Sequence, residues 1–197
     1  KERADSEQKA IFYIVGDNEK ILRSSPLLES YNKNNIEVLI LDDKEIDDII
    51  TPTIGTYKDW EFKDITACEP PKVEQSEEAK KEVEEKFQDI TKKIKDKLGD
   101  AVKDVKVTNR LSESPSCVVK DAADAQMAAM AHMFRAMGQA MPESAPILEI
   151  NPEHEIVKKL NGCADESTIE DVSWILLDQA KLSEGMEITD TVAFAKR

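Results

Sequence analysis

Two short apolar runs near the start of the chain constrain its fold most strongly. They read AIFYIV over 10–15 and IEVLIL over 36–41, and both are rich in β-branched or aromatic residues. Runs of this length and composition are typical of buried strands. The stretches 16–24 and 25–35 between them begin with helix-capping residues, and Pro26 suits a first helical turn. The order of these segments predicts a strand, then helices, then a second strand.

The next segment extends this pattern. An acidic helix is expected over 42–55, broken by Pro52 and Gly55, and WEFKDI over 60–65 is expected to be a third strand. Together these elements form a β-α-β arrangement of about 65 residues, which is too small for a large doubly wound sheet.

A composition shift over 66–75, with adjacent prolines at 70 and 71, predicts a linker. The clearest helix of the chain follows over 76–100. Its apolar residues recur every three or four positions, glutamates crowd its start, lysines crowd its end, and Gly99 stops it.

The remaining elements expected outside residues 121–145 are three short strands followed by three helices. Short strands are expected at 102–107, 116–120 and 146–150. A helix capped by Asn151 should end at Gly162. A longer helix should open with a capping box from Ser167 to Glu170 and close at Gly185, and a last helix should be capped by Thr189 or Asp190. The chain is therefore predicted to be an α+β protein.

Charge and hydropathy argue against nucleic acid and membrane as partners. The formal net charge of −14 opposes binding to nucleic acid or anionic membrane. No apolar run is long enough to span a bilayer, and the start shows no signal peptide.

Three cysteines, Cys68, Cys117 and Cys163, match no zinc spacing and are expected to be free and reduced in a cytoplasmic protein. Because the chain opens without methionine and stops inside an expected helix, we expect a fragment.

No pattern of catalytic residues emerges. The six glycines form no phosphate-binding loop, and no H-E-x-x-H or G-x-S-x-G motif occurs. His132 and His154 lie in different expected helices. A partly buried structural role is favoured for His132 over a ligand or base, and His154 is expected to be exposed in the first turn of its helix. The sequence thus predicts no catalytic residue, no metal site and no cofactor site in this chain.

Five of the six methionines fall within QMAAMAHMFRAMGQAM, residues 126–141. On a helix, Met127, Met130, Phe134, Met137 and Met141 follow spacings of three, four, three and four, and Met133 flanks their face. Such a stripe is either a core helix or a surface for varied apolar partners. Few charged residues mark an outer face here, and methionine repacks easily against dissimilar shapes, which favours the second reading.

Several longer stretches resemble one family. They are SSPLLE (24–29), NIEVLIL (35–41), VKDVKVTNRLSESP (102–115), EINPEHEIVKKL (149–160) and LLDQAKLSEG (176–185). In this order they resemble the ninety-kilodalton heat-shock chaperone family, most closely its bacterial form, nearly end to end. The resemblance implies a small three-layer α/β subdomain over 1–66 that ends the family's middle domain, a linker over 67–75, and a mixed α/β C-terminal dimerisation domain over 76–197.

The resemblance also implies a role. Full-length members are ATP-driven clamps that assist the folding of unfolded or stressed client proteins, and ATP and Mg would bind in a domain outside this chain. The methionine helix would contact clients through Met127, Met130, Met133, Phe134, Met137 and Met141. Helices 168–184 and from 189 onward would form a four-helix bundle in a homodimer, through Ile169, Val172, Ile175, Leu176, Ala180, Leu182, Val192 and Phe194. The resemblance further implies a client-contacting tryptophan in the acidic helix after the second strand. This chain has Ile49 or Ile50 nearest that place, and the departure argues against the same contact here.

Two other functions compete with this reading. A small α/β ligand-binding enzyme could use residues 10–65, but GDNEK after the first strand has one glycine where dinucleotide folds need several. A methionine-rich groove could bind hydrophobic signal segments, although such proteins usually carry basic RNA-binding residues and this chain is acidic.

Overall fold

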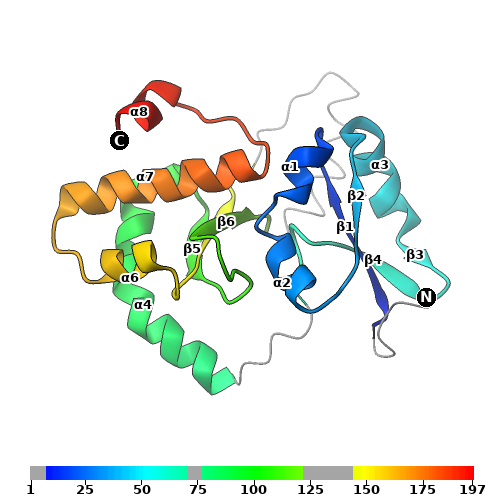
Figure 1. Cartoon of the computed structure of the whole chain (residues 1–197), viewed down its shortest axis with the longest axis horizontal. Coiled ribbons are helices and arrows are strands. Elements are labelled where there is room, and N and C mark those ends of the chain that lie inside the picture. The colour runs from blue at the N-terminus through cyan, green and yellow to red at the C-terminus, as the bar shows by residue number, and fades with distance from the viewer. Residues whose placement is uncertain (1–7, 71–76, 122–143) are drawn as a thin grey trace.

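The computed structural model describes residues 8–70, 77–121 and 144–197, which form two mixed sheets with helices around them (Figure 1). The first sheet has the order β2-β1-β4-β3; β1 pairs in parallel with β2 and β4, and β3 pairs antiparallel with β4. The three expected strands are confirmed. The bounds are β1 (Ala10–Val15), β2 (Val38–Leu41), β3 (Thr56–Tyr57) and β4 (Trp60–Asp64).

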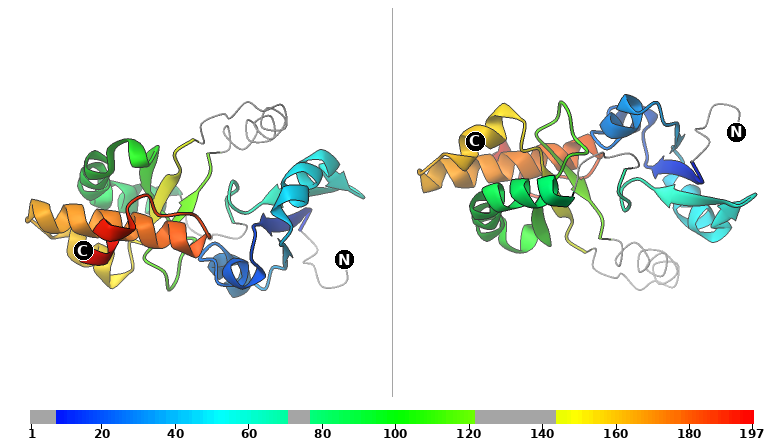
Figure 2. Two further views of the ribbon diagram at one scale, coloured as in Figure 1. Left: turned by 90° about the horizontal axis from the view of Figure 1, so that it is seen from above. Right: turned by 90° about the horizontal axis from the view of Figure 1, so that it is seen from below.

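Helices cover both faces of this first sheet. α1 (Glu19–Arg23) and α2 (Leu28–Lys33) lie on one side and α3 (Lys44–Ile54) on the other (Figures 1 and 2). The expected break at Pro52 is wrong, because α3 continues through it and ends at Gly55, whose φ is +63°. Pro52 lies in the last turn, so its missing N–H removes a single backbone bond and the helix survives.

The hairpin between β3 and β4 was not predicted. Its turn residues Lys58 and Asp59 have φ of 49° and 68°. Tight hairpin turns of this kind normally carry Asn-Gly or Asp-Gly, because those residues accept positive φ most easily. Lys-Asp therefore provided no signal in the sequence.

The second sheet has the order β5-β7-β6, with β7 parallel to β5 and antiparallel to β6. α4 packs against β5, α7 packs against β6, and the two helices contact each other. The bounds are α4 (Glu77–Leu98), a 3₁₀ turn (Gly99–Ala101), β5 (Asp104–Val107), β6 (Ser116–Val119), β7 (Ile147–Ile150), α6 (Glu155–Asn161), α7 (Glu166–Ser183) and α8 (Thr191–Lys196).

Two expected helix caps are wrong. α6 is capped by His154, whose Nδ1 accepts from the N–H of Ile156, while Asn151 instead joins β7 to the loop before β6 through the carbonyl of Ser114. The N-cap of α7 lies two residues before the expected Ser167, because Asp165 accepts from the N–H of Thr168 at 2.9 Å. Both caps are polar residues two or three positions from the predicted ones, so the helices were found and their first residues were not.

The second sheet is buried on both faces. Val118, Leu148 and Ile150 face a core made with α4, α6 and α7. Their alternating neighbours Cys117, Val119 and Ile147 join a second core with β1, α1 and α2. This second core contains residues from both sides of the expected linker, so the two sheets are packed together through shared apolar side chains.

Candidate functional site

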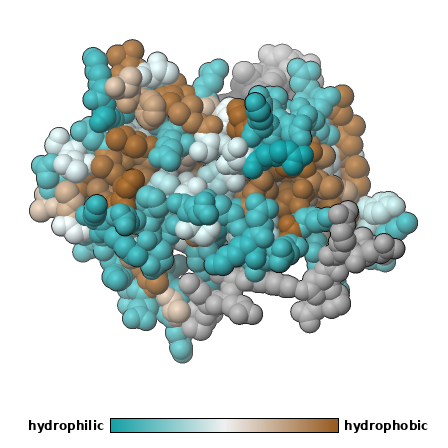
Figure 3. All heavy atoms as spheres, viewed as in Figure 1, coloured by the Kyte–Doolittle hydropathy of each residue, from teal (hydrophilic) through white to brown (hydrophobic). Residues whose placement is uncertain are grey.

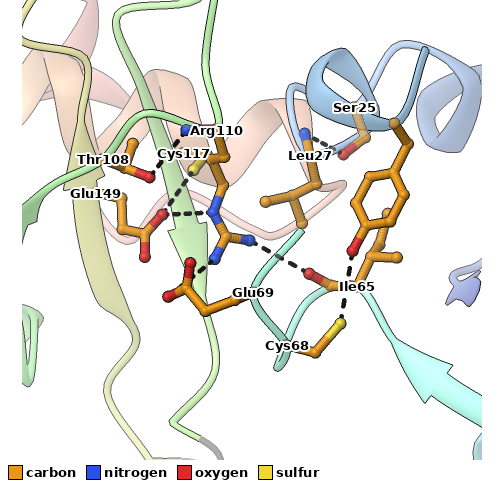
Figure 4. A network of polar contacts seen from close by, with 10 residues as sticks. Ser25, Leu27, Ile65, Cys68, Glu69, Thr108, Arg110, Cys117 and Glu149 are labelled. Atoms are coloured by element: carbon orange, nitrogen blue, oxygen red, sulfur yellow. Dashed lines mark hydrogen bonds and ion pairs between the residues drawn. The ribbon is translucent and has the colours of Figure 1, made fainter. Parts of the chain in front are cut away.

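The junction between the two sheets contains three acidic residues from different elements, one buried and two partly buried. Glu149 lies on β7, Glu29 on α2 and Glu184 at the end of α7. Each of them meets a partner contributed by another part of the chain. Figure 4 shows the part of this region around Arg110.

Arg110 is the central cation of the junction, and its side chain is only 4% exposed. Its Nε lies 2.7 Å from Oε2 of Glu149, an ion pair without hydrogen-bond alignment. A second guanidinium nitrogen donates to the carbonyl of Ile65 at 3.4 Å, across the expected domain boundary (Figure 4). Burial raises the pKa of Glu149, and the charge of Arg110 opposes that rise. A pair this deeply buried holds its partners in one geometry, because a lone charge there is costly.

Glu29 binds the loop before β6 through its carboxylate. Oε2 accepts from the backbone N–H groups of Ser112 at 2.6 Å and Glu113 at 2.9 Å, and Oε1 accepts from Ser114 at 3.1 Å. Burial by itself would raise the pKa of Glu29, but these hydrogen bonds outweigh it and hold the pKa below 4.5. Three consecutive N–H groups around one carboxylate fix α2 against the second half of the chain.

Glu184 makes the third link. Its Oε1 lies 2.6 Å from Oγ of Ser25, which in turn accepts from the N–H of Leu27. Burial raises the pKa of Glu184 from 4.5 to about 7, and the bond to Ser25 only partly opposes this. The carboxyl group therefore changes charge near neutral pH, unlike Glu29.

These groups are suited to holding parts of the protein together, and no arrangement for catalysis is evident among them. The three cysteines are free, as expected, and burial raises the pKa of Cys117 well above 9. A buried thiol of that kind is a poor nucleophile. Among residues 8–70, 77–121 and 144–197, no cluster of His, Cys, Asp and Glu side chains could hold a metal ion.

The glycine after β1 has a packing role. A Cβ at Gly16 would lie 2.8 Å from Cδ2 of Leu22, so the missing side chain is what allows α1 to pack close to the strand. Close packing therefore accounts for the single glycine after β1. A nucleotide-binding fold would need a glycine-rich loop at this position. Within the described part of the chain, no helix is long and apolar enough to cross a membrane.

The residues predicted to contact clients lie outside the described residues. They are Met127, Met130, Met133, Phe134, Met137 and Met141, and His132 lies in the same segment. Their role stays a prediction.

The residues predicted to dimerise fall into three sets by burial. Ile169, Leu176 and Ala180 are at most 1% exposed and belong to the chain's own core, so a second copy cannot reach them. Leu182 and Val192 are 47% and 62% exposed. Val172, Ile175 and Phe194 are half-buried. Of the eight residues predicted to dimerise, these last five are the ones that reach the surface, and Met186 between α7 and α8 is exposed as well.

Sequence reasoning missed an exposed apolar row on α3. Ile46, Ile49, Ile50 and Ile54 are all about half exposed, at 49–55%, and Leu39 and Tyr57 nearby are similarly exposed. Figure 3 shows this apolar surface at the edge of the molecule where α3 lies. The spacing of three, one and four between the isoleucines was the available signal, but the surrounding acids suggested a solvated helix.

Comparisons with known proteins identify the family of this chain. The family model described as Hsp90 protein matches residues 1–197. A chaperone protein HtpG from Aliarcobacter butzleri is 90% identical over the whole chain, and one from Sulfurovum is 60% identical over 99% of it. A third HtpG, from Campylobacter jejuni, is 43% identical over 95% of the chain. The chain spans about a third of the length of these relatives, 31%, 31% and 29% respectively. The match along all 197 residues shows that the chain belongs to the Hsp90 family.

Proposed function

We propose that this chain is the dimerisation and client-binding part of an ATP-dependent molecular chaperone. In the whole protein it would join the end of the middle domain, residues 1–66, to the C-terminal domain, residues 76–197. ATP and Mg would bind outside the chain, and the chain itself would have no enzymatic activity. Membership of the Hsp90 family and relatives named as chaperone proteins support the chaperone role.

The exposed isoleucine row of α3 carries the client-binding proposal. Four isoleucines on one short helix leave a sizeable apolar surface in water, and such surfaces usually mark interaction sites. Acidic residues of the same segment, including Asp43 and Asp47, surround the row. An apolar client segment flanked by lysine or arginine would match both features. We propose that α3 and the methionine stretch of 126–141 both contact clients.

Replacing Ile49 and Ile50 together with serine in the full-length chaperone tests this role. Because both side chains are already about half exposed, the melting temperature should change little. Suppression of the aggregation of an unfolded client should weaken. Ile156→Ser is the matched control, since Ile156 is 45% exposed on α6, away from the row. Equal client suppression by both variants would count against a client site on α3.

The exposed apolar residues of α7, α8 and their connection support the dimer. Leu182, Met186 and Val192 are 38–62% exposed, and Figure 3 shows apolar surface around α7 and α8. Burying a fully exposed side chain of this kind contributes about 1.5–3 kcal/mol, and these half-exposed ones would contribute roughly half of that. Three or four from each copy would then be comparable with an association cost of about 4–15 kcal/mol.

Sedimentation of the chain from about 1 to 100 μM, compared with a Leu182→Ser/Val192→Ser double variant, tests this dimer. The parent should show a dimer that dissociates on dilution, and the variant should be monomeric with unchanged thermal stability. Leu176→Ala provides the contrast: it should cost about 2–5 kcal/mol of folding stability, because Leu176 lies in the core of one copy.

A further inference from the structure

The strand β2 is an edge of the first sheet without the usual protection against pairing with another chain. Its four residues are all apolar, and its register with β1 runs without a bulge. Among the described residues, β2 pairs with no strand other than β1. Proteins commonly blunt such edges with lysine, proline, a bulge or a very short strand. The sequence VLIL of β2 supplies none of these devices.

The other three edge strands in the described part of the chain are protected. β3 is only two residues long. β5 carries the exposed charges of Asp104 and Lys106, and Oδ1 of Asp104 accepts from the N–H of Val105 at 2.8 Å. β6 is buried along its whole length, and Lys120 just after it donates its N–H to the carbonyl of Thr66 at 2.8 Å. The open apolar edge is therefore a property of β2 in particular.

The backbone of β2 directs hydrogen-bonding groups to its open side. The N–H of Gly16 donates to the carbonyl of Leu41 at 3.1 Å, so Leu41 directs its backbone groups toward β1. Because these groups alternate along a strand, Leu39 does the same, and Val38 and Ile40 direct their N–H and C=O groups away from β1. A further strand lying along β2 would pair with these groups, which is how exposed sheet edges bind extended peptides.

The side chains of β2 place an apolar surface beside this edge. Val38 and Ile40 pack against the core shared with α1 and α2. Leu39 faces the opposite side of the sheet, where α3 packs over β1 and β4, and it is 46% exposed. Leu39 and the isoleucine row of α3 thus lie on the same face of the sheet.

Acidic residues stand at both ends of β2. Glu37 precedes the strand, Asp42 and Asp43 follow it, and all three are exposed. A segment lying along β2 is therefore favoured by apolar side chains at alternate positions, which pair on the face of Leu39, and by lysine or arginine beyond its ends. Unfolded chains expose such segments, whereas folded proteins keep them within their own sheets.

We propose that β2 binds client proteins by strand addition, so that an extended apolar client segment with basic flanks joins the four strands of the first sheet. The segment pairs through its backbone with Val38 and Ile40, and its side chains on the face of α3 meet Leu39. Backbone pairing makes little demand on sequence, which suits a site that receives many clients. This inference rests on the proposed client-binding role of α3 and adds to it the strand that holds the client.

N-methylation of a model client peptide tests the backbone pairing. The probe alternates valine and threonine, ends in lysines and carries a fluorophore, and its binding to the full-length chaperone is measured by anisotropy. Methylating every valine and threonine nitrogen should raise the dissociation constant more than about tenfold. Methylating only the valines or only the threonines should leave at least one analogue that binds like the parent, because a strand uses every second N–H toward one neighbour. Unchanged binding of the fully methylated peptide would overturn strand addition, and so would loss of binding by both half-methylated analogues.

Leu39→Lys in the full-length chaperone tests the location, with Tyr57→Lys as the matched control. The two residues are 46% and 54% exposed and lie on opposite edge strands of the same sheet. A lysine on β2 protects the edge and repels the basic flanks of the peptide, so the dissociation constant should rise about tenfold, while Tyr57→Lys should leave it unchanged. Equal affinities of the two variants would overturn the assignment to β2. The methylated peptides need no substitution in the chaperone, so they decide the question if Leu39→Lys lowers the melting temperature.

These outcomes separate strand addition from the proposed client site on α3. If the Ile49→Ser/Ile50→Ser variant loses client suppression while Leu39→Lys and the fully methylated peptide behave like their parents, α3 binds clients and strand addition is wrong. If none of these changes has an effect, both proposals fail. Pairing of β2 with a second copy of the chain is a further outcome. It would appear in sedimentation as self-association that Leu39→Lys removes, with no binding of the peptide by the parent, and it would overturn the client assignment.

Discussion

Ser25 and Glu184 are 159 residues apart in the chain, yet their Oγ and Oε1 atoms lie 2.6 Å apart. This contact joins the segment before α2 to the end of α7, between the two sheets. Asp64 and Lys120 are the charged groups that act on Glu184 from neighbouring elements, with opposite effects on its pKa. The charge of this one partly buried carboxyl group therefore changes near neutral pH, because its pKa is about 7.

Stability should fall as the pH rises through neutrality. Burial raises the pKa of Glu184 in the folded protein to about 7, above its usual 4.5, so the folded state binds the extra proton between these values. The stabilisation is complete below about pH 4.5 and is lost as pH rises through 7, by up to about 3 kcal/mol for this group. Glu184→Gln should remove this part of the pH dependence, measured by denaturant unfolding between pH 5 and 8. A slope unchanged in the variant would contradict the assignment.

Breaking the buried pair should destabilise the junction strongly. Arg110→Ala leaves Glu149 buried, with a side chain 9% exposed, and without its cation. We expect a loss of about 3–5 kcal/mol in the free energy of unfolding. Replacing both residues by apolar ones, as in Arg110→Met with Glu149→Leu, should recover most of it. If the double variant were less stable than the single one, the pair would not be the source of the loss.

Glu29→Gln should weaken the contact between α2 and the loop over 112–114. The amide places an NH₂ group where a carboxylate oxygen now accepts backbone N–H groups. A loss of about 1–3 kcal/mol in unfolding free energy is expected. Glu19→Gln is the control, because its ion pair with Arg23 is exposed and should contribute less than about 1 kcal/mol. Similar losses in both variants would argue against a special role for Glu29.

The methionine stretch remains open to a direct test. If Met130 and Met137 lie on a client surface, replacing both with serine should leave the melting temperature nearly unchanged and weaken client suppression by the full-length chaperone. If they were core residues, each change should cost roughly 2–5 kcal/mol. A large stability loss with client binding retained would overturn the client-surface interpretation.

The chain by itself should neither bind nor hydrolyse ATP, since its sequence contains no phosphate-binding loop. Calorimetric titration with ATP and magnesium should show no heat of binding. Saturable binding in the micromolar range would contradict both this prediction and the proposed layout, in which the nucleotide site lies outside the chain.

The strands and helices were largely predictable because their signals are local. AIFYIV became β1, the lysine-rich amphipathic segment became α4, and Gly99 with its φ of +53° ended that helix as expected. The misses were also local. Lys58–Asp59 form a turn without the residues that usually mark one, and Asp165, two residues before the expected Ser167, caps α7. Several polar residues can serve as a cap, so sequence identifies the helix better than its first residue.

The sequence by itself determined which segments are strands or helices and to which family the chain is similar. Only the tertiary structure decided which apolar residues are accessible. Ile169 and Leu182 look alike in the pattern of α7, but one faces the core and the other faces water. Likewise, nothing near Ser25, Glu29 or Arg110 in the sequence reveals partners about 40 to 160 residues away. Burial and long-range pairing depend on how the two sheets pack together, and a local pattern of residues contains no information on that packing.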